Sequence, residues 1–80
     1  MDKAEIIKKN TQELIDKMVN SAEIEIVAEE EVFHVNIKVA EEAPTVIGRH
    51  GETIRALQKI IEVIVFKQTG EKVDLLINVN

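Results

Sequence analysis

Gly48 and Gly51 enclose Arg49 and His50, and this short segment has residue types that suit the binding of an anionic backbone. Glycine has no β-carbon, so a turn built on two glycines lets a phosphodiester chain approach closely. Free N–H groups at the start of a following helix can donate hydrogen bonds to phosphate oxygens. Arginine and histidine side chains add further donors that suit an anion. Residues 48–51 are therefore the candidate contact with a phosphate backbone.

The candidate segment lies in the one stretch of the chain that has a net positive charge. Residues 45–69 carry Arg49, Arg55, Lys59 and Lys67 against two acidic residues, which gives a net charge of +2. Residues 1–44 carry a net charge of −6, and the whole chain carries −5. The negative net charge of the whole chain repels phosphate groups, which argues against a protein that coats nucleic acid. We therefore expect local contacts and an affinity in the micromolar range or weaker.

The sequence has no residue pattern typical of an enzyme. It contains no cysteine, one serine and two histidines. These counts exclude a cysteine nucleophile, and they offer neither a serine–histidine–carboxylate set nor a cluster of metal ligands. We expect a protein that is not an enzyme and that holds no metal and no cofactor.

The length and hydropathy of the chain limit its organisation. Eighty residues allow a single domain, which we place over residues 1–80. No apolar run reaches the roughly 18 residues needed to span a bilayer, and the charged start Met1–Glu5 lacks the pattern of a signal peptide. The absence of cysteine suits a reducing compartment. We expect a cytoplasmic location and no contact with a membrane.

The first half of the chain predicts one helix and a pair of strands. From Asp2 to about Asn20, apolar residues recur on one face with Thr11 among them, which predicts an amphipathic helix. Two segments then alternate with a period of two, around Ile24–Ala28 and over Phe33–Val39. The acidic triplet of residues 29–31 separates them, so the two strands should form an antiparallel hairpin.

The second half predicts two helices and a last strand. Pro44 suits the start of a short helix over residues 45–47, which Gly48 ends. A long helix should run from Gly51 to a cap at Gly70, with one broad apolar face. That face contains Ile54, Leu57, Ile60, Ile61, Ile64 and Val65. Val63 and Phe66 lie off this face and should contact the first helix. Alternation over residues 73–79 predicts the last strand.

The order of these elements is αββααβ. A strand, helical crossover and strand in one sheet is right-handed and parallel, so the last strand should pair in parallel with Phe33–Val39. We expect an α+β, two-layer sandwich in which the first and the long helix cover one face of a three-stranded mixed sheet. The residues expected on the open, solvated face are Glu23, Glu25, His34, Asn36, Lys38, Asp74 and Asn78.

A GxxG turn between two helices, beside a sheet, resembles the RNA-clamping element of the KH module, and the αββααβ order is that of type II KH domains. Residues 47–58, IGRHGETIRALQ, resemble the motif I-G-[KR]-x-G-x-T-[LI]-x-A-L-Q of the bacterial Jag family of RNA-binding proteins. The likeness covers nearly the whole chain. In that family a second nucleic-acid-binding domain typically follows the KH domain. The length of the chain is instead similar to that of short stand-alone bacterial KH proteins, but those usually differ after the GxxG. We therefore expect a Jag-like KH domain, either stand-alone or part of a longer protein.

The resemblance implies which residues contact RNA. Gly48, Arg49, His50 and Gly51 would contact the backbone, and Ile47 and Ile54 would form the floor of the groove. Arg55 and Lys59 would extend the basic strip along the long helix. The loop before the last strand would form the other wall, with Lys67 and Lys72. Such a groove holds about four unpaired nucleotides.

Other interpretations stay open for the same residues. The segment 48–51 could be a plain turn between helices, and Arg55 and Lys59 could be a solvated helix face.

The leading function is a binding module for single-stranded RNA, with single-stranded DNA as a related ligand. The alternative is a protein-interaction module on the KH fold, whose groove or exposed strand docks another chain. A second KH chain or an adjacent nucleic-acid-binding domain is a further candidate partner. Affinity that falls steeply with salt would distinguish RNA binding from apolar docking.

We predict that RNA binding strengthens modestly as the pH falls toward about 6, because an exposed imidazole gains a positive charge in that range and attracts phosphate. His50 is the candidate group. Titrations of short single-stranded RNA at several pH values should show the effect in the wild type and not in His50→Ala. An unchanged pH dependence in that variant would assign the effect to His34 or to titrating acids.

Overall fold

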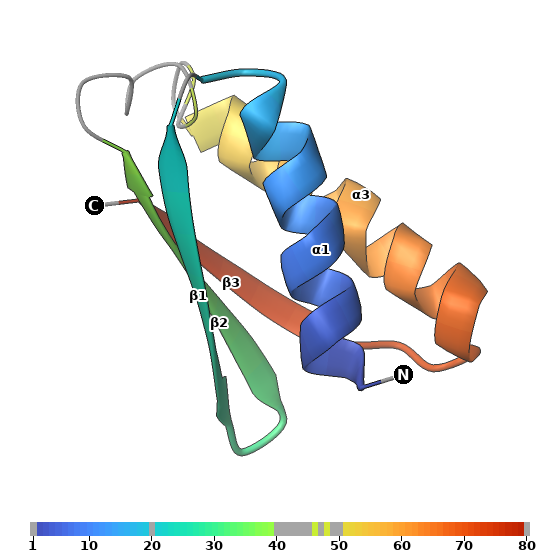
Figure 1. The fold of residues 1–80 in the computed structure, drawn as a ribbon. Helices are drawn as coiled ribbons and strands as arrows, with labels where there is room; N and C mark the ends of the chain where they lie inside the picture. Colours follow the sequence, from blue (N-terminus) through green and yellow to red (C-terminus); the bar gives the residue numbers. More distant parts are fainter. Residues whose placement is uncertain (1, 20, 40–45, 47, 49–50, 80) are drawn as a thin grey trace.

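The computed structural model describes residues 2–19, 21–39, 46, 48 and 51–79. The elements in chain order are α1 (Lys3–Asp16), β1 (Ala22–Glu29), β2 (Val32–Val39), α3 (Glu52–Thr69) and β3 (Asp74–Val79). Both helices lie on the same side of the sheet (Figure 1). The predicted two-layer α+β arrangement is therefore confirmed. Of the short helix predicted over residues 45–47, only Val46 lies among the described residues.

The sheet has the strand order β1-β2-β3. β1 and β2 pair antiparallel, with Ile26 opposite Val35, and β2 and β3 pair in parallel, with Val35 opposite Ile77. The predicted hairpin and the predicted parallel last strand are both confirmed. The consequence is that β1 and β3 are the two edges of the sheet, and α3 crosses from the end of β2 back to the start of β3.

Helix α1 is shorter than its sequence predicts. Asp2 caps it by accepting a hydrogen bond from the Ala4 N–H at 3.3 Å. The expected end was near Asn20, but the last helical residue is Asp16. A tighter turn follows, in which the Met18 N–H donates to the Ile15 carbonyl at 2.9 Å. This turn still buries Val19, which explains why the apolar pattern continues beyond the helix itself.

Helix α3 has the predicted ends and, apart from Ile60, the predicted apolar face. Gly70 caps it with φ of 76°, and its N–H donates to the Phe66 carbonyl at 2.7 Å. The fully buried stripe is narrow and contains Leu57, Ile61 and Val65. Ile60, predicted to be in the buried face, is 45% exposed. Successive residues lie about 100° apart around a helix, so Ile60 points away from the sheet when Ile61 points toward it.

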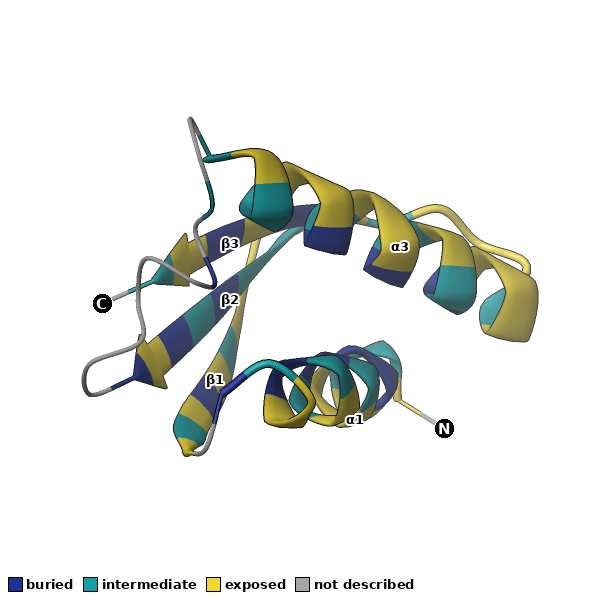
Figure 2. Ribbon diagram, turned by 90° about the horizontal axis from the view of Figure 1, so that it is seen from above, coloured by how far each residue is buried: buried dark blue, intermediate teal, exposed yellow. Residues whose placement is uncertain are grey.

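Val63 and Phe66 also differ from the prediction. They were expected to contact α1, but they are 44% and 46% exposed and do not belong to the core. Together with Ile60 they follow the spacing i, i+3, i+6 along α3. This spacing places them away from the buried stripe. Figure 2 shows that α3 is exposed on its side away from the sheet.

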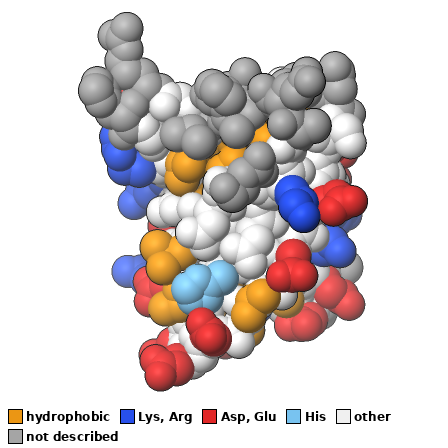
Figure 3. Space-filling model, turned by 90° about the vertical axis from the view of Figure 1, so that its left-hand side faces the viewer, with side chains coloured by type: hydrophobic (Ala, Val, Ile, Leu, Met, Phe, Trp, Pro, Cys, Tyr) orange, Lys and Arg blue, Asp and Glu red, His pale blue; other side chains and the backbone are white. Residues whose placement is uncertain are grey.

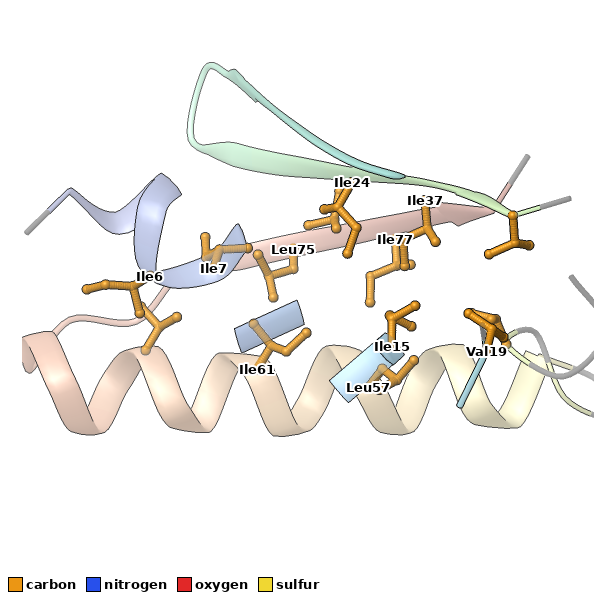
Figure 4. Close-up of a cluster of buried hydrophobic side chains, with 14 residues drawn as sticks. Ile6, Ile7, Ile15, Val19, Ile24, Ile37, Leu57, Ile61, Leu75 and Ile77 are labelled. Carbon is orange, nitrogen blue, oxygen red and sulfur yellow. The ribbon is translucent and has the colours of Figure 1, made fainter. Parts of the chain in front are cut away.

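The core is one layer of aliphatic side chains between the helices and the sheet. Ile15 of α1 and Leu57 and Ile61 of α3 point toward Ile37, Leu75 and Ile77 of the sheet (Figure 4). Thr11 is the one buried polar residue among those described, and its hydroxyl has no hydrogen-bond partner. The sequence pattern placed Thr11 on the apolar face of α1, and the structure confirms that position.

The other face of the sheet is open and largely polar, as predicted. Asn78 donates from Nδ2 to Oδ1 of Asn36 at 3.2 Å, and His34 Nε2 lies 3.4 Å from a Glu29 carboxylate oxygen. The prediction did not include Val27 and Leu76, which are exposed and lie on either side of His34 in the strand register. Figure 3 shows apolar side chains beside this histidine, with acidic side chains around them.

We expect Thr11→Val to stabilise the fold by about 1 kcal/mol, because valine has nearly the same shape and removes a buried hydroxyl without a partner. Urea denaturation followed by circular dichroism would measure the change. Thr11→Ala is the matched control and should destabilise, since it removes the hydroxyl but leaves a cavity. A lower midpoint for Thr11→Val would show that the hydroxyl makes a stabilising hydrogen bond.

Candidate nucleic-acid interface

The two glycines of the GxxG segment form a closed turn immediately before α3. Gly48 and Gly51 have φ angles of 74° and 73°, in the left-handed region that favours glycine. The Gly51 N–H donates to the Gly48 carbonyl at 3.3 Å. Two left-handed residues three positions apart turn the chain sharply into the helix. The backbone conformation therefore favours glycine at both positions.

Gly48 also lies against the first turn of α3. A β-carbon at this position would overlap the Thr53 hydroxyl and lie 2.9 Å from the Thr53 backbone nitrogen. Thr53 was quoted in the sequence motif but was not among the predicted site residues. Its position explains the pairing of glycine and threonine in that motif, because the threonine occupies the space that any larger residue at Gly48 would need.

Arg55 is the predicted basic residue that the structure places beside the turn. A β-carbon at Gly51 would lie 3.3 Å from Nη1 of Arg55, so the guanidinium lies over this glycine. Ile54, its neighbour, is half-buried and packs against the core. Arg55 therefore borders the turn on the exposed side of α3, and Ile54 borders it on the core side.

The start of α3 suits an anion for a second reason. Gly51 is the N-cap residue and, being glycine, makes no side-chain hydrogen bond to the first turn of the helix. The N–H groups at a helix start carry a partial positive charge. Glu52, in the same turn, is exposed and opposes that charge. The net electrostatic attraction of an anion to this helix start is therefore modest, which agrees with the weak affinity expected from the sequence.

Val46 anchors the segment before the turn, because its side chain is fully buried in the core. Ile47, Arg49 and His50 lie outside the described residues. The turn is thus held by Val46 on one side and by α3 on the other.

The remaining predicted lysines lie elsewhere. Lys67 and Lys72 flank the cap at Gly70, whereas the turn is at the opposite end of an 18-residue helix. At about 1.5 Å per residue, that helix is about 27 Å long. Lys59 lines a groove of about 410 Å³ together with both of these lysines. The structure therefore separates the predicted residues into a turn group and a distal lysine group.

The distal groove has a mixed character. Its lining consists of Lys59, Glu62, Val63, Phe66, Lys67, Lys72, Val73 and Asp74. Three basic and two acidic side chains surround two exposed apolar ones. Sequence reasoning assigned the lysines to the wall of the RNA groove, but it had no measure of their distance from Gly48.

Gln58 is a residue that the sequence analysis did not select. Its side-chain oxygen accepts a hydrogen bond from the Ile77 N–H at 3.0 Å. Ile77 lies in edge strand β3, so Gln58 covers a backbone donor that the sheet leaves unpaired. The only sequence feature that could have indicated Gln58 is its place as the final glutamine of the motif over residues 47–58. This hydrogen bond joins the N-terminal half of α3 directly to β3.

A comparison of the sequence with protein-family models places the chain in a known group. The model for the KH domain of KhpA/KhpB matches residues 4–77. The chain belongs to this KH family. The predicted resemblance to a Jag-type KH domain is confirmed, because the match covers both helices and nearly all of the sheet. No individual curated protein matched the chain.

Membership in the KH family implies a general capacity to bind RNA. KH domains are not a family of enzymes. Within residues 2–19, 21–39, 46, 48 and 51–79, no three side chains of histidine, cysteine, aspartate or glutamate gather as metal ligands would. Among the described residues, neither helix is long and apolar enough to cross a bilayer.

We predict that Gly48→Ala destabilises this KH domain by at least about 2 kcal/mol, from its left-handed φ and the overlap with Thr53. Gly70→Ala is the matched control, because Gly70 has φ of 76° but nothing within 4 Å of the added carbon. It should cost only about 1 kcal/mol. Urea denaturation would compare the two variants.

Thr53→Ala provides a further test of the close contact. The cost of Gly48→Ala should be smaller in this background, because the hydroxyl that the added carbon overlaps is absent. The contact would be disproved if Gly48→Ala and Gly70→Ala lowered the free energy of unfolding equally and Thr53→Ala did not alter the effect of Gly48→Ala. Those results would show that the first turn of α3 shifts easily to admit the added carbon.

Proposed function

We propose that this KH domain binds single-stranded RNA by holding its phosphate backbone at the turn of residues 48–51. The observation that carries the proposal is the left-handed conformation of both Gly48 and Gly51, next to the uncapped start of α3. A turn without side chains at its two ends allows close approach of a backbone, and the helix start attracts an anion. Membership in an RNA-binding family supports the same function.

Each residue near the turn has a proposed role. Arg49 and His50 donate to phosphate oxygens from within the turn, and Arg55 adds a guanidinium beside Gly51. Ile47 and Ile54 form the apolar floor on which bases lie. A groove of this kind accommodates about four unpaired nucleotides. Single-stranded DNA, which carries the same phosphate groups, is a related ligand of the same site.

The distal lysine group has a different proposed role. A ligand of about four nucleotides held at Gly48 does not require Lys67 or Lys72, which lie at the far end of α3. Longer RNA strands reach them and gain affinity from their charge. Because the whole chain carries −5, the affinity for short strands stays in the micromolar range or weaker.

The exposed side of α3 supports a protein partner as well. Ile60, Val63 and Phe66 follow the spacing of a helix seam, and each is nearly half exposed. We propose this seam as the place where a second KH chain or an adjacent nucleic-acid-binding domain packs. A second RNA-binding unit raises the effective affinity of two weak sites through simultaneous contact. The single domain over residues 1–80 then acts in the cytoplasm as one part of a larger RNA-binding assembly.

The test of RNA binding replaces Arg49 and His50 together by aspartate. The local charge falls by about three units where phosphates approach, so attraction becomes repulsion and binding to short single-stranded RNA should fall at least tenfold. Gly48 and Gly51 remain, so the turn conformation is kept. Fluorescence anisotropy with a labelled oligonucleotide would measure the affinity, and a thermal melt would show that the fold is intact.

The matched control changes the same charge at the other end of α3. Gln68→Asp with Lys72→Asp also removes three units of charge, at two exposed positions. This variant should bind a four-nucleotide RNA nearly as well as the wild type. Equal losses in both variants would assign binding to the overall charge rather than to the turn. Unchanged binding in the aspartate turn variant would favour the protein-interaction function.

A further inference from the structure

The two edges of the sheet differ in how their backbone groups are used. On the β3 edge, the Ile77 N–H is taken by Gln58. On the β1 edge, Gln12 donates from Nε2 to the Ala22 carbonyl at 3.4 Å, at the first residue of the strand. Beyond that residue, the described part of the chain places no hydrogen-bonding partner on the outer side of β1. The β1 edge is therefore open along most of its length.

The register shows which groups of β1 face outward. In an antiparallel pair, residues alternate between those that bond to the partner strand and those whose N–H and C=O point away from it. The outward Ala22 carbonyl places Ile24, Ile26 and Ala28 in the second class, because they follow at intervals of two. These three alternate residues of β1 thus present unpaired N–H and C=O groups at its outer edge. An added strand requires this arrangement.

A groove lies beside this open edge. Its volume is about 810 Å³, and it is lined on the helix side by Ala4, Glu5 and Lys8 of α1. On the sheet side it is lined by residues 23–26 of β1, and it continues to Asn36, Lys38 and Asn78. α1 runs beside β1 without covering its outer edge (Figure 1). There is therefore room for another backbone next to β1.

Charge decides which kind of chain fits. Glu23 and Glu25 project from β1 and are exposed, and Glu5 lines the helix side of the groove. These three acidic side chains outnumber the two basic ones in the lining, Lys8 and Lys38, of which Lys38 lies opposite Glu23 in the strand register. Glu29 belongs to the same row, although its carboxylate lies near His34. Figure 3 shows several acidic side chains on this face of the molecule, with basic side chains among them. Nucleic acid would be repelled here, and a second copy paired through β1 would set glutamates against glutamates.

We propose that the β1 edge binds an extended basic segment of another protein, which adds a fourth strand to the sheet. The backbone of the segment pairs with Ile24, Ile26 and Ala28. Its basic side chains lie on the open face opposite Glu23 and Glu25. The alternate side chains of the segment point toward α1 and lie beside the inward-facing Ile24 and Ile26, which favour apolar residues, while the charged Glu5 and Lys8 also line this side of the groove. The preferred partner sequence therefore alternates basic and apolar residues.

This interface is independent of the proposed RNA site. It uses the outer edge of β1, whereas the GxxG turn lies before α3 and the apolar seam lies on the exposed side of α3. An RNA-binding protein whose acidic edge holds a basic protein segment can contact both ligands at once. Loss of one ligand need not affect the other.

The direct test uses an eight-residue peptide of alternating lysine and valine. Hydrogen exchange measured by NMR should show protection of the Ile24, Ile26 and Ala28 amides when this peptide is added. Two control peptides separate pairing from charge. One alternates glutamate and valine and should not bind. The other is the lysine–valine peptide with N-methyl groups on the amides that would pair, and it should bind at least tenfold more weakly.

A charge-reversal pair tests the position of the contact. Glu23→Lys with Glu25→Lys should weaken binding of the lysine–valine peptide about tenfold and allow the glutamate–valine peptide to bind. Glu30→Lys with Glu31→Lys makes the same change in net charge in the turn beyond β1 and should have a much smaller effect. A thermal melt would check that each variant folds.

Three outcomes would overturn the proposal. They are equal binding of the N-methylated peptide, equal weakening by the turn variant, and binding without protection of the three edge amides. The peptide comparison uses the wild-type protein, so it decides the question even where a strand variant fails to fold. An RNA titration of the Glu23/Glu25 variant would show separately whether the GxxG site still works.

Discussion

The packing of one sheet face against two helices is the constraint on which the rest of this structure depends. The described chain has no disulfide, and none of its side chains gather as a metal site, so burial of aliphatic side chains supplies the cohesion. Ile7 and Ile15 of α1, Val35 of β2, and Ile61 and Val65 of α3 are fully buried. Each such side chain contributes about 1.5–3 kcal/mol through removal from water. Without this layer, neither the turn before α3 nor the strand edges would have a defined position.

The GxxG turn takes its geometry from that core. Val46 is buried just before the turn, and Leu57 is buried two turns into α3, so both flanks are fixed by packing. Between these flanks, Gly48 fits closely against Thr53, and Arg55 lies over Gly51. Packing around Val46, Thr53 and Leu57, none of which is assigned to RNA binding, therefore positions Gly48 and Gly51.

Much of the fold follows from sequence periodicity, because strands and helices that bury one face must repeat with periods near 2 and 3.6. The hairpin, the parallel last strand and the cap at Gly70 all follow from this and from the chemistry of turns.

Other features depend on tertiary packing. Ile60 and Ile61 are equally apolar. Ile60 is exposed and Ile61 is buried because the rest of the fold covers only a narrow face of α3. The positive charge of Lys72 indicates an anion-friendly residue, but only the length of α3 shows that it lies far from Gly48. The acceptor role of Gln58 depends on a strand 19 residues away.

The hydrogen bond between Gln58 and Ile77 has a consequence for the thermodynamics of binding. It joins the helix that begins at the turn to an edge strand, so the first turns of α3 cannot lift from the sheet without exposing a backbone donor. A binding surface that is already held in place loses little conformational entropy when a ligand arrives. Because the chain carries a net charge of −5, preorganisation of this kind would support the proposed RNA contact. In the proposed complex, Gln58 would contribute to affinity through the order it imposes before any ligand is present.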